Sequence, residues 1–285
     1  MKKIYIVAGG DRRFAAAAEY LAEKGHDVRT LAGCCDDART AEDIPPADCL
    51  ILPVPVTADG ENLFASEKHG KIPLESLPAL LKPGGAVFGG RVSEKTAEIF
   101  GRNGFVITDY TKDEEFAVRN AAATAEGALA AAMTAQDITL FRQNILVIGL
   151  GRIGKSLVRI LSGFGAHTAA AVRSPQNLVW AEILGCRGFP IENLPDEISR
   201  FTLIFNTAPA AVLTRDVLYK AHKDVLIIDL ASAPGGTDLA AAKELSLNAF
   251  GYNGIPGRTS PVSAGMTAAE VIENILQRNK KEEKN

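Results

Sequence analysis

Cysteine is scarce in this sequence, with four residues among 285, and their spacing argues against the common cysteine-based sites. No C-x-x-C pair occurs, and no histidine lies near a cysteine at metal-ligand spacing. The sequence therefore predicts neither a metal site nor a disulfide framework. Reduced structural thiols are typical of a cytoplasmic protein. The residues concerned are Cys34, Cys35, Cys49 and Cys186.

An excess of charge of one sign is also lacking. The chain has 31 basic and 34 acidic residues, for a formal net charge of −3. This balance provides no electrostatic footprint for nucleic acid or for an anionic membrane surface. No apolar stretch approaches the ~20 residues that span a bilayer, and the short apolar run after Lys2 and Lys3 is predicted to be a strand rather than a signal peptide. We therefore expect no nucleic-acid partner and no membrane partner.

What the sequence does contain is an alternation of short apolar runs with amphipathic helical patterns. This alternation is typical of α/β layering with mostly parallel sheets. An alanine-rich segment at 113–136, acidic at its start, predicts one long helix in the middle of the chain. The predicted strands are 4–7, 28–31, 49–54, 86–89 and 106–108 before this helix, and 144–149, 168–172, 203–205 and 225–230 after it.

A glycine motif follows the apolar strand at 144–149 and opens a helix with an apolar face. Gly149 is expected to permit the tight turn, Gly151 to let the backbone approach a pyrophosphate, and Gly154 to let helix and strand pack closely. The helix N-terminus, including Arg152 and Ile153, would present N–H groups to the phosphates. The motif therefore predicts a dinucleotide-binding Rossmann domain, and the alternative is a structural glycine turn.

The end of the next strand favours NADP over NAD. NAD-specific domains place a carboxylate there to bind the ribose 2′-hydroxyl. This strand ends at Arg173 and Ser174, whose side chains suit a 2′-phosphate. Arg173 would otherwise be an ordinary exposed arginine at the end of a strand.

Two further loops are expected to line the same cofactor site, because they follow later strands of the domain. The alternative for each is plain turn chemistry. The candidate cofactor-binding residues in these loops are Asn206, Thr207 and Pro209 in the first, and Asp229, Ala231 and Ser232 in the second.

These patterns together predict an α/β fold of two βα domains with parallel sheets. The second is the Rossmann domain, a long helix links the two, and a C-terminal helix closes the chain. We expect an N-terminal, substrate-side domain at 1–115, the connecting helix at 116–138, the NADP-binding domain at 139–258 and the C-terminal helix and tail at 259–285.

This layout first suggests a D-2-hydroxyacid dehydrogenase, but the residues for that chemistry are missing. Those enzymes carry an arginine after the strand that ends in a DLA-type segment, where this chain has Ser232 and Ala233. They also carry a histidine in the position of Val262, so the general acid/base is absent.

Nearly the whole chain instead resembles the A subunit of dipicolinate synthase. The resemblance is carried by VAGGDRR near the start, NAAATAEG at 120–127, VIGLGRIGKS at 147–156, IDLASAPGGTD at 228–238 and GIPGRTSPVSAG at 254–265. It implies oxidation of a dihydrodipicolinate-type intermediate to dipicolinate with hydride transfer to NADP. It also implies a partner, the flavoprotein-like B subunit of dipicolinate synthase, and a place in the mother-cell cytoplasm of a sporulating bacterium.

A dicarboxylate substrate calls for cationic anchors, and a proton must also be accepted. Arg12, Arg13 and Arg258 are the candidates for carboxylate recognition. Asn120 and Thr124 lie four residues apart and share a helix face. As a hypothesis, Glu126 orders the site or accepts the proton, while the alternative is an exposed helix glutamate.

Two other functions stay open at this point. One is an NADP-dependent oxidoreductase that acts on another small acid. The other is a non-catalytic NADP-binding subunit of a composite enzyme, which the missing histidine makes reasonable. The sequence leaves the oligomeric state open, including a homo-oligomer.

Overall fold

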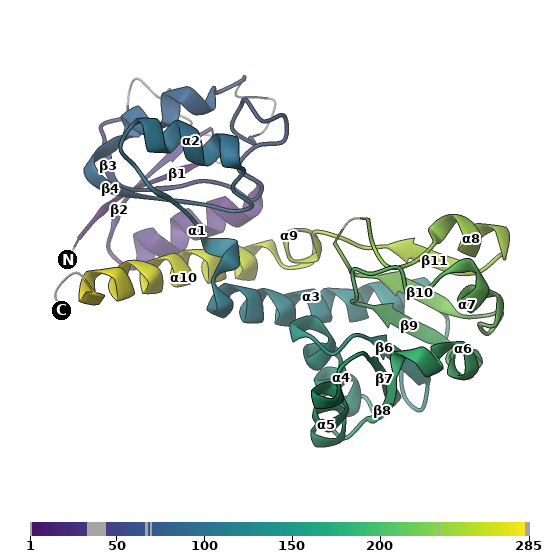
Figure 1. Ribbon diagram of the computed structural model, residues 1–285. Helices are drawn as coiled ribbons and strands as arrows, with labels where there is room; N and C mark the ends of the chain where they lie inside the picture. The colour runs from purple at the N-terminus through teal and green to yellow at the C-terminus, as the bar shows by residue number, and fades with distance from the viewer. Residues whose placement is uncertain (1, 33–43, 66–67, 69, 233, 283–285) are drawn as a thin grey trace. The chain divides into compact units, whose positions relative to one another are not determined.

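The computed structural model describes residues 2–282 except 33–43, 66–67, 69 and 233 (Figure 1). Cys34, Cys35 and Ala233 therefore lie outside the described residues. The chain divides into two compact units. Unit 1 comprises residues 1–120 and 256–285, and unit 2 comprises residues 121–255.

Unit 1 contains a five-stranded parallel sheet in the order β2-β1-β3-β4-β5. Its interior strands read as apolar runs because both faces of the sheet are covered. Residues Tyr5–Ala8 of β1, for example, are all buried. The strands are β1 (Ile4–Ala8), β2 (Asp27–Leu31), β3 (Ala47–Ile51), β4 (Leu81–Gly89) and β5 (Ile107–Asp109).

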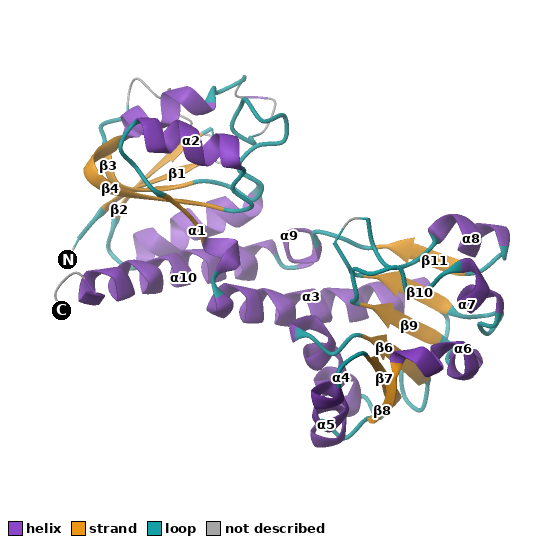
Figure 2. Ribbon diagram, in the orientation of Figure 1, coloured by secondary structure: helices purple, strands orange, loops and turns teal. Residues whose placement is uncertain are grey.

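One face of this sheet packs on α1 (Arg12–Glu23) and α10 (Pro261–Glu282), and the other on α2 (Glu94–Arg102) and the 3₁₀ segment η3 (Leu74–Leu80) (Figure 2). Helices α1 and α10 approach very closely. A Cβ atom on Gly265 of α10 would lie 1.9 Å from the backbone oxygen of Arg13. The sequence predicted the last helix but did not indicate which element it packs against. In the structure that element is α1.

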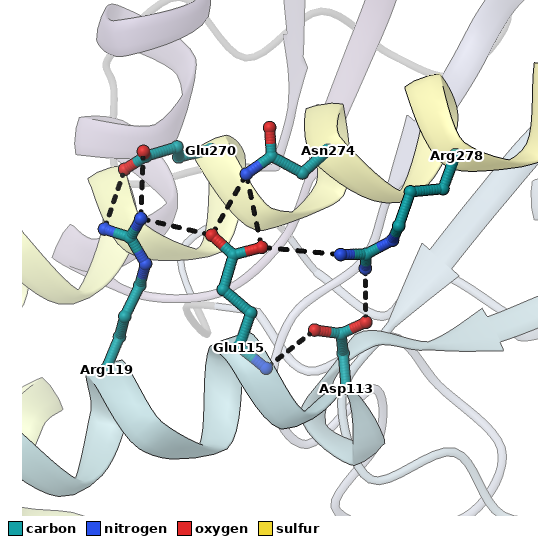
Figure 3. A network of polar contacts seen from close by, with 6 residues as sticks. All are labelled: Asp113, Glu115, Arg119, Glu270, Asn274 and Arg278. Carbon is teal, nitrogen blue, oxygen red and sulfur yellow. Dashed lines mark hydrogen bonds and ion pairs between the residues drawn. The ribbon is translucent and has the colours of Figure 1, made fainter. Parts of the chain in front are cut away.

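A polar network fastens α10 to the first turns of α3 (Glu114–Ala135) and the residue before it (Figure 3). Arg119 pairs with Glu270 at 3.2 Å and with Glu115 at 3.1 Å. Asn274 donates to Glu115 at 3.0 Å, and Arg278 pairs with Asp113. Exposed ion pairs contribute little singly, but this network joins two segments about 150 residues apart in the chain.

Unit 2 contains a six-stranded parallel sheet in the order β11-β10-β9-β6-β7-β8. The strands are β6 (Asn144–Ile148), β7 (His167–Val172), β8 (Arg187–Pro190), β9 (Leu203–Asn206), β10 (Leu226–Asp229) and β11 (Asn248–Gly251). Strands β6, β9 and β10 form the buried centre of the sheet, with the backbone of each paired on both sides.

Helices cover both faces of this second sheet (Figure 1). One face packs on α4 (Arg152–Gly163), α5 (Pro175–Ile183) and the alanines of α3 from Ala125 to Ala132. The other packs on α6 (Leu194–Glu197), α7 (Arg215–Tyr219) and α8 (Leu239–Glu244). The remaining short helical segments are α9 (Ile255–Thr259), η4 (Tyr110–Lys112), η5 (Ile191–Asn193) and η6 (Ile198–Arg200).

The α/β fold class with a Rossmann-type second sheet is confirmed. The long helix expected at 113–136 is α3. The edge strands β8 and β11 were not predicted, because each is four residues long and carries an exposed or half-buried residue at most positions. Among the described helices, none is both long and apolar enough to cross a membrane.

Candidate functional site

The glycine turn between β6 and α4 has the geometry that each of its glycines predicts. Gly149 has φ +87°, a left-handed conformation that favours glycine. A Cβ atom on Gly154 would lie 2.1 Å from the backbone oxygen of Gly149, so helix and turn touch at this point. Gly151, the N-cap residue of α4, would place a Cβ atom in open space. The turn is therefore closed on its protein side and open above the helix N-terminus.

This turn lies at the switch point of the unit 2 sheet. The chain leaves β6 toward β7 on one side and returns through β9 on the other, so the loops after β6 and β9 diverge. Open α/β sheets bind ligands at such points, beyond the carboxyl ends of the strands. The hydroxyl of Thr207, after β9, donates to the oxygens of Ile148 and Gly149 at 2.9 and 3.2 Å. Thr207 thereby joins the two loops that flank the switch point.

Asn206 and Asp229, two of the predicted cofactor-binding residues, have buried side chains that are occupied within the protein. The Asn206 amide donates to Asp229 at 3.1 Å, and both residues are at most 3% exposed. Asp229 also accepts from the backbone N–H groups of Ala231 and Gly236, each at 2.9 Å. These side chains shape the loops after β9 and β10. Their direct contact with a cofactor stays a prediction.

Gly236 is part of the same arrangement, and its role was missed at the sequence level. A Cβ atom there would lie 2.3 Å from the oxygen of Ala208 and 2.5 Å from the amide nitrogen of Asn206. The PGG segment is therefore a close packing site beneath the loops as well as a turn. Pro209 and Ser232 are exposed, while Ala231 is buried.

Arg173 and Ser174 follow β7, and their side chains have no hydrogen-bond partner in the part of the chain that the structure describes. Arg173 is exposed, and among the described residues its guanidinium has no hydrogen bond or ion pair. Ser174 is the N-cap residue of α5, yet its hydroxyl makes no capping bond, and Pro175 follows at the first helical position. Both side chains are therefore available to a ligand at the carboxyl edge of the sheet.

Lys155, in the first turn of α4, was not singled out from the sequence. Its ammonium lies 3.9 Å from the centre of the Trp180 ring, a cation–π contact that joins α4 to α5. Arg152 is exposed and Ile153 is half-buried in the same turn.

In unit 1 the corresponding switch point lies between β1 and β3, because the chain leaves β1 toward β2 and returns through β3. Arg13 is held there by Asp11: its Nε and Nη2 atoms donate to the carboxylate at 2.8 Å each. Nη2 also donates to the oxygen of Val54 at 3.0 Å. Arg13 therefore connects the loop after β1 to the loop after β3, and these contacts use three of the five N–H groups of its guanidinium.

The pKa of Asp11 reflects this pairing. Burial raises the pKa, but the hydrogen bonds from the Arg13 side chain and backbone lower it by more than burial raises it. The pKa therefore lies below its ordinary value. The carboxylate is thus a fixed anion that also caps α1, accepting from the Arg13 N–H at 3.0 Å.

Arg12 differs from its neighbour Arg13. It is the exposed first residue of α1, and among the described residues its side chain has no hydrogen bond or ion pair. The third predicted arginine, Arg258 of α9, is exposed but already interacts with another group. The structure thus separates the free Arg12 from the engaged Arg13, which the sequence could not do.

Arg91 is a candidate that the sequence analysis missed. It follows β4 with φ +54°, a left-handed conformation that is uncommon for a non-glycine residue. Asp109 holds this backbone in place by accepting from Arg91 N at 3.3 Å and Val92 N at 3.1 Å. The Arg91 side chain is exposed and, within the described part of the chain, unpaired.

The loop before Arg91 packs directly on the segment that Arg13 binds. A Cβ atom on Gly90 would lie 2.4 Å from the Cβ of Val54, and Gly90 N donates to the oxygen of Pro53 at 3.1 Å. Arg91 therefore sits beside the end of β3. Strained backbone conformations of this kind are concentrated at functional sites, so Arg91 is a candidate functional residue.

The three catalytic candidates on α3 do not all lie on one face of the helix. Thr124 is buried, whereas Glu126 is exposed and, among the described residues, has no partner. Two residues correspond to about 200° around a helix, so Thr124 and Glu126 face different sides. Asn120 and Thr124 share a face as predicted, and both already make polar contacts. The catalytic roles stay predictions.

No group of His, Cys, Asp and Glu side chains that could hold a metal ion occurs among the described residues. Cys49 is fully buried, and burial raises its pKa well above the ordinary value. Burial also raises the pKa of Cys186, to about 11. Neither thiol has the character of a nucleophile.

Comparison with known proteins identifies related sequences for both units. The family model for the N-terminal domain of the dipicolinate synthase A subunit matches residues 4–111. The model for the D-isomer specific 2-hydroxyacid dehydrogenase NAD binding domain matches residues 94–235, which include the glycine turn but end before Val262.

The dipicolinate synthase A subunit of Bacillus subtilis is 31% identical over 170 residues, which are 60% of this chain and 57% of that protein. The crystal structure of the dipicolinate synthase A chain from Bacillus subtilis superposes with a TM-score of 0.88 at 25% identity, covering 99% of this chain and 98% of that one. For the dipicolinate synthase A subunit from Bacillus halodurans the TM-score is 0.85 at 25% identity, with 96% and 97% covered.

The chain belongs to the dipicolinate synthase A subunit family. The resemblance inferred from the sequence segments is thereby confirmed. In this chain the dehydrogenase-type NAD-binding domain follows an N-terminal domain that matches a family model of its own.

Proposed function

We propose that this protein is an NADP-dependent oxidoreductase that converts a dihydrodipicolinate-type intermediate to dipicolinate (pyridine-2,6-dicarboxylate). Family membership supports the substrate class. The observation that carries the cofactor half of the proposal is the glycine turn, closed beneath Gly154 and open above Gly151. The space around Gly151, where a Cβ atom would meet nothing within 4 Å, supports a pyrophosphate position at this turn.

The residues that would hold NADP lie along the carboxyl edge of the unit 2 sheet. The first N–H groups of α4 bind the pyrophosphate, supported by the positive end of the helix dipole. Arg173 and Ser174 bind the 2′-phosphate, since neither side chain has a partner among the described residues and one is cationic. Asn206 and Asp229 act indirectly, by fixing the loops after β9 and β10.

Arg12 and Arg91 are the best candidates for the two substrate carboxylates. Each is exposed, carries an unpaired guanidinium among the described residues and follows a strand of the unit 1 sheet. Strands β1 and β4 are separated only by β3, so their ends are about 10 Å apart by sheet geometry. Two long side chains at that spacing can reach the two ends of a small dicarboxylate.

The chemistry requires little activation from the protein. A dihydropyridine dicarboxylate loses one hydride and one proton, and the product gains aromatic resonance energy. NADP, when bound, supplies the hydride acceptor. The protein's task is then to orient the ring and to provide a path for the proton. Thr124, Asn120 and Glu126 stay candidates for that path, with Glu126 on a different side of α3 from Thr124.

The relatives are named as one of several subunits, which supports a further part of the proposal, a separate flavoprotein-like B subunit of dipicolinate synthase as partner. The proposed location is the mother-cell cytoplasm of a sporulating bacterium. A non-catalytic NADP-binding role within such a pair is the competing function. Its support is Val262, half exposed where the D-2-hydroxyacid dehydrogenases have histidine.

The deciding experiment measures reduced nicotinamide by absorbance after mixing the purified chain, NADP and the dihydrodipicolinate pool. NADP reduction with pyridine-dicarboxylate as product is expected from the chain alone. Activity that appears only with a second protein would support the composite alternative. Absence of NADP binding by calorimetry would contradict both functions. In the same assay Glu126→Gln tests the proton acceptor, and an unchanged rate excludes Glu126.

A further inference from the structure

A cavity of about 420 Å³ opens at the edge of unit 1 where the strands begin. Its walls include Lys3, just before β1, Lys24 at the end of α1, and Lys280 near the end of α10. The free arginines Arg12 and Arg91 lie at the opposite edge, where the strands end. The cavity is therefore separate from the candidate substrate site.

The charge around this cavity is unbalanced. None of the three lysine side chains pairs with a carboxylate among the described residues. Glu273 in the wall bonds to His26 at 2.8 Å and supplies one negative charge, which is fewer than the three positive charges of the lysines. Asp48, close to Lys3, is likewise occupied, because it accepts from Lys82 Nζ at 2.7 Å and from the Ile4 N–H at 2.8 Å.

Helix dipoles explain only part of this cluster. Lys24 and Lys280 lie at the C-terminal ends of their helices, where a cation is favourable. Lys3 lies on no helix and is half-buried. Burial, and then the charge of Lys280, lower its pKa more than the nearby charges of Glu273 and Asp48 raise it, so its ammonium is held at a free-energy cost. An anion in the cavity would relieve that cost.

The wall of the cavity is also preorganised. The backbone N–H of Lys3 donates to Nδ1 of His26 at 3.3 Å, so the ring proton lies on Nε2 and is donated to Glu273. The His26 ring meets the ring of Tyr5 edge-on at 5.0 Å, and Tyr5 is 1% exposed. These contacts fix β1, the turn before β2 and α10 around the lysines. Such rigidity lowers the entropic cost of binding.

We propose that this cavity binds a small polyanion bearing phosphate or carboxylate groups, held by the ammonium groups of Lys3, Lys24 and Lys280. Lysine binds phosphate as a compact point charge, and three lysines together suit a multivalent anion. Because β1, α1 and α10 all contribute to the wall, the bound anion would stabilise unit 1 against unfolding by linkage. The site does not depend on the proposed oxidoreductase function.

The test is calorimetric titration with inorganic phosphate and, separately, with citrate at constant ionic strength in chloride. The cavity variant carries two substitutions, Lys3→Gln and Lys280→Gln. The matched control is Lys223→Gln with Lys243→Gln, two exposed lysines of unit 2 that remove the same charge. We expect binding to the unaltered chain and to the control, and at least about tenfold weaker binding to the cavity variant. Circular dichroism checks that both variants fold.

The arms of the test separate the possible outcomes. Binding of phosphate alone assigns phosphate chemistry, and binding of citrate alone assigns carboxylate chemistry. The proposal is overturned if neither phosphate nor citrate binds at ~10 mM, which would mean a Kd too weak to matter. It is also overturned if the cavity variant and the control variant lose affinity equally. Repeating the titration on Gly154→Ala distinguishes the cavity from the glycine turn, because a phosphate bound at the turn would lose affinity there.

Discussion

Gly154 and Gly149 meet so closely that a single added carbon has no room between them. A Cβ atom on Gly154 would lie 2.1 Å from the backbone oxygen of Gly149, and that oxygen belongs to the turn that is open to a ligand above Gly151. The packing of α4 on β6 and the shape of the proposed phosphate cradle are therefore one structural feature. A change that pushes the helix outward alters both stability and binding.

Gly154→Ala is accordingly expected to destabilise unit 2 by about 1–3 kcal/mol, the usual cost of overpacking, and to weaken NADP binding. Thermal unfolding and calorimetry measure the two effects. The control is Gly163→Ala at the other end of α4, where a Cβ atom would meet nothing within 4 Å. Equal behaviour of the two variants would contradict the close-packing argument.

The glycine turn was predictable because its physics is local. Gly149 is favoured by its own positive φ, and Gly154 is required by a backbone oxygen five residues away, so the order strand, motif, helix carries the information. The roles of Asn206 and Asp229 were only partly predictable. Their positions after strands pointed to the cofactor, but the bond between them joins residues 23 apart and is buried.

Arg173→Gln is predicted to weaken binding of NADP by about tenfold or more and to leave NAD nearly unchanged. The lost interaction is a charge-assisted bond to the 2′-phosphate, which NAD lacks. Titration of each variant with both dinucleotides provides the measurement. Arg159→Gln, an exposed arginine of α4, is the matched control. A parallel loss for NADP and NAD would assign Arg173 to another role.

Arg12→Gln and Arg91→Gln are each expected to raise the KM for the dicarboxylate by about tenfold while NADP affinity stays the same. The reasoning is that each removes one carboxylate anchor without touching the glycine turn. Arg102→Gln, an exposed arginine at the end of α2, controls for the loss of charge. Unchanged KM in either variant removes that arginine from the substrate site.

Arg91 also shows where sequence reasoning ends in unit 1. Nothing around residue 91 marks it, since its conformation depends on Asp109, 18 residues later, and on the packing of Gly90 against Val54. Likewise, the sequence alone does not distinguish Arg12 from Arg13 as a carboxylate-binding residue. Only the fold shows that the carboxylate of Asp11 and the oxygen of Val54 occupy Arg13 and leave Arg12 free.

The ion pair between Asp11 and Arg13 leads to a prediction about pH. The pKa of Asp11 is lowered in the folded protein, so the pair contributes stability above the unfolded aspartate pKa of about 3.9. That contribution is lost as the pH falls below this value through the lowered, folded pKa. Asp11→Asn keeps an acceptor for the cap of α1 but removes the charge.

Urea unfolding is therefore expected to show Asp11→Asn less stable than the unaltered chain at neutral pH. The difference should shrink near pH 3, where the unfolded carboxyl is largely protonated at its ordinary pKa of about 3.9. Arg13→Gln removes the partner, so adding Asp11→Asn to it should reproduce only the small, pH-insensitive part of the loss. If the difference between Asp11→Asn and the unaltered chain is the same at both pH values, the ion pair does not fix the loops after β1 and β3. In that case the backbone bonds alone would have to hold the end of β1 in place.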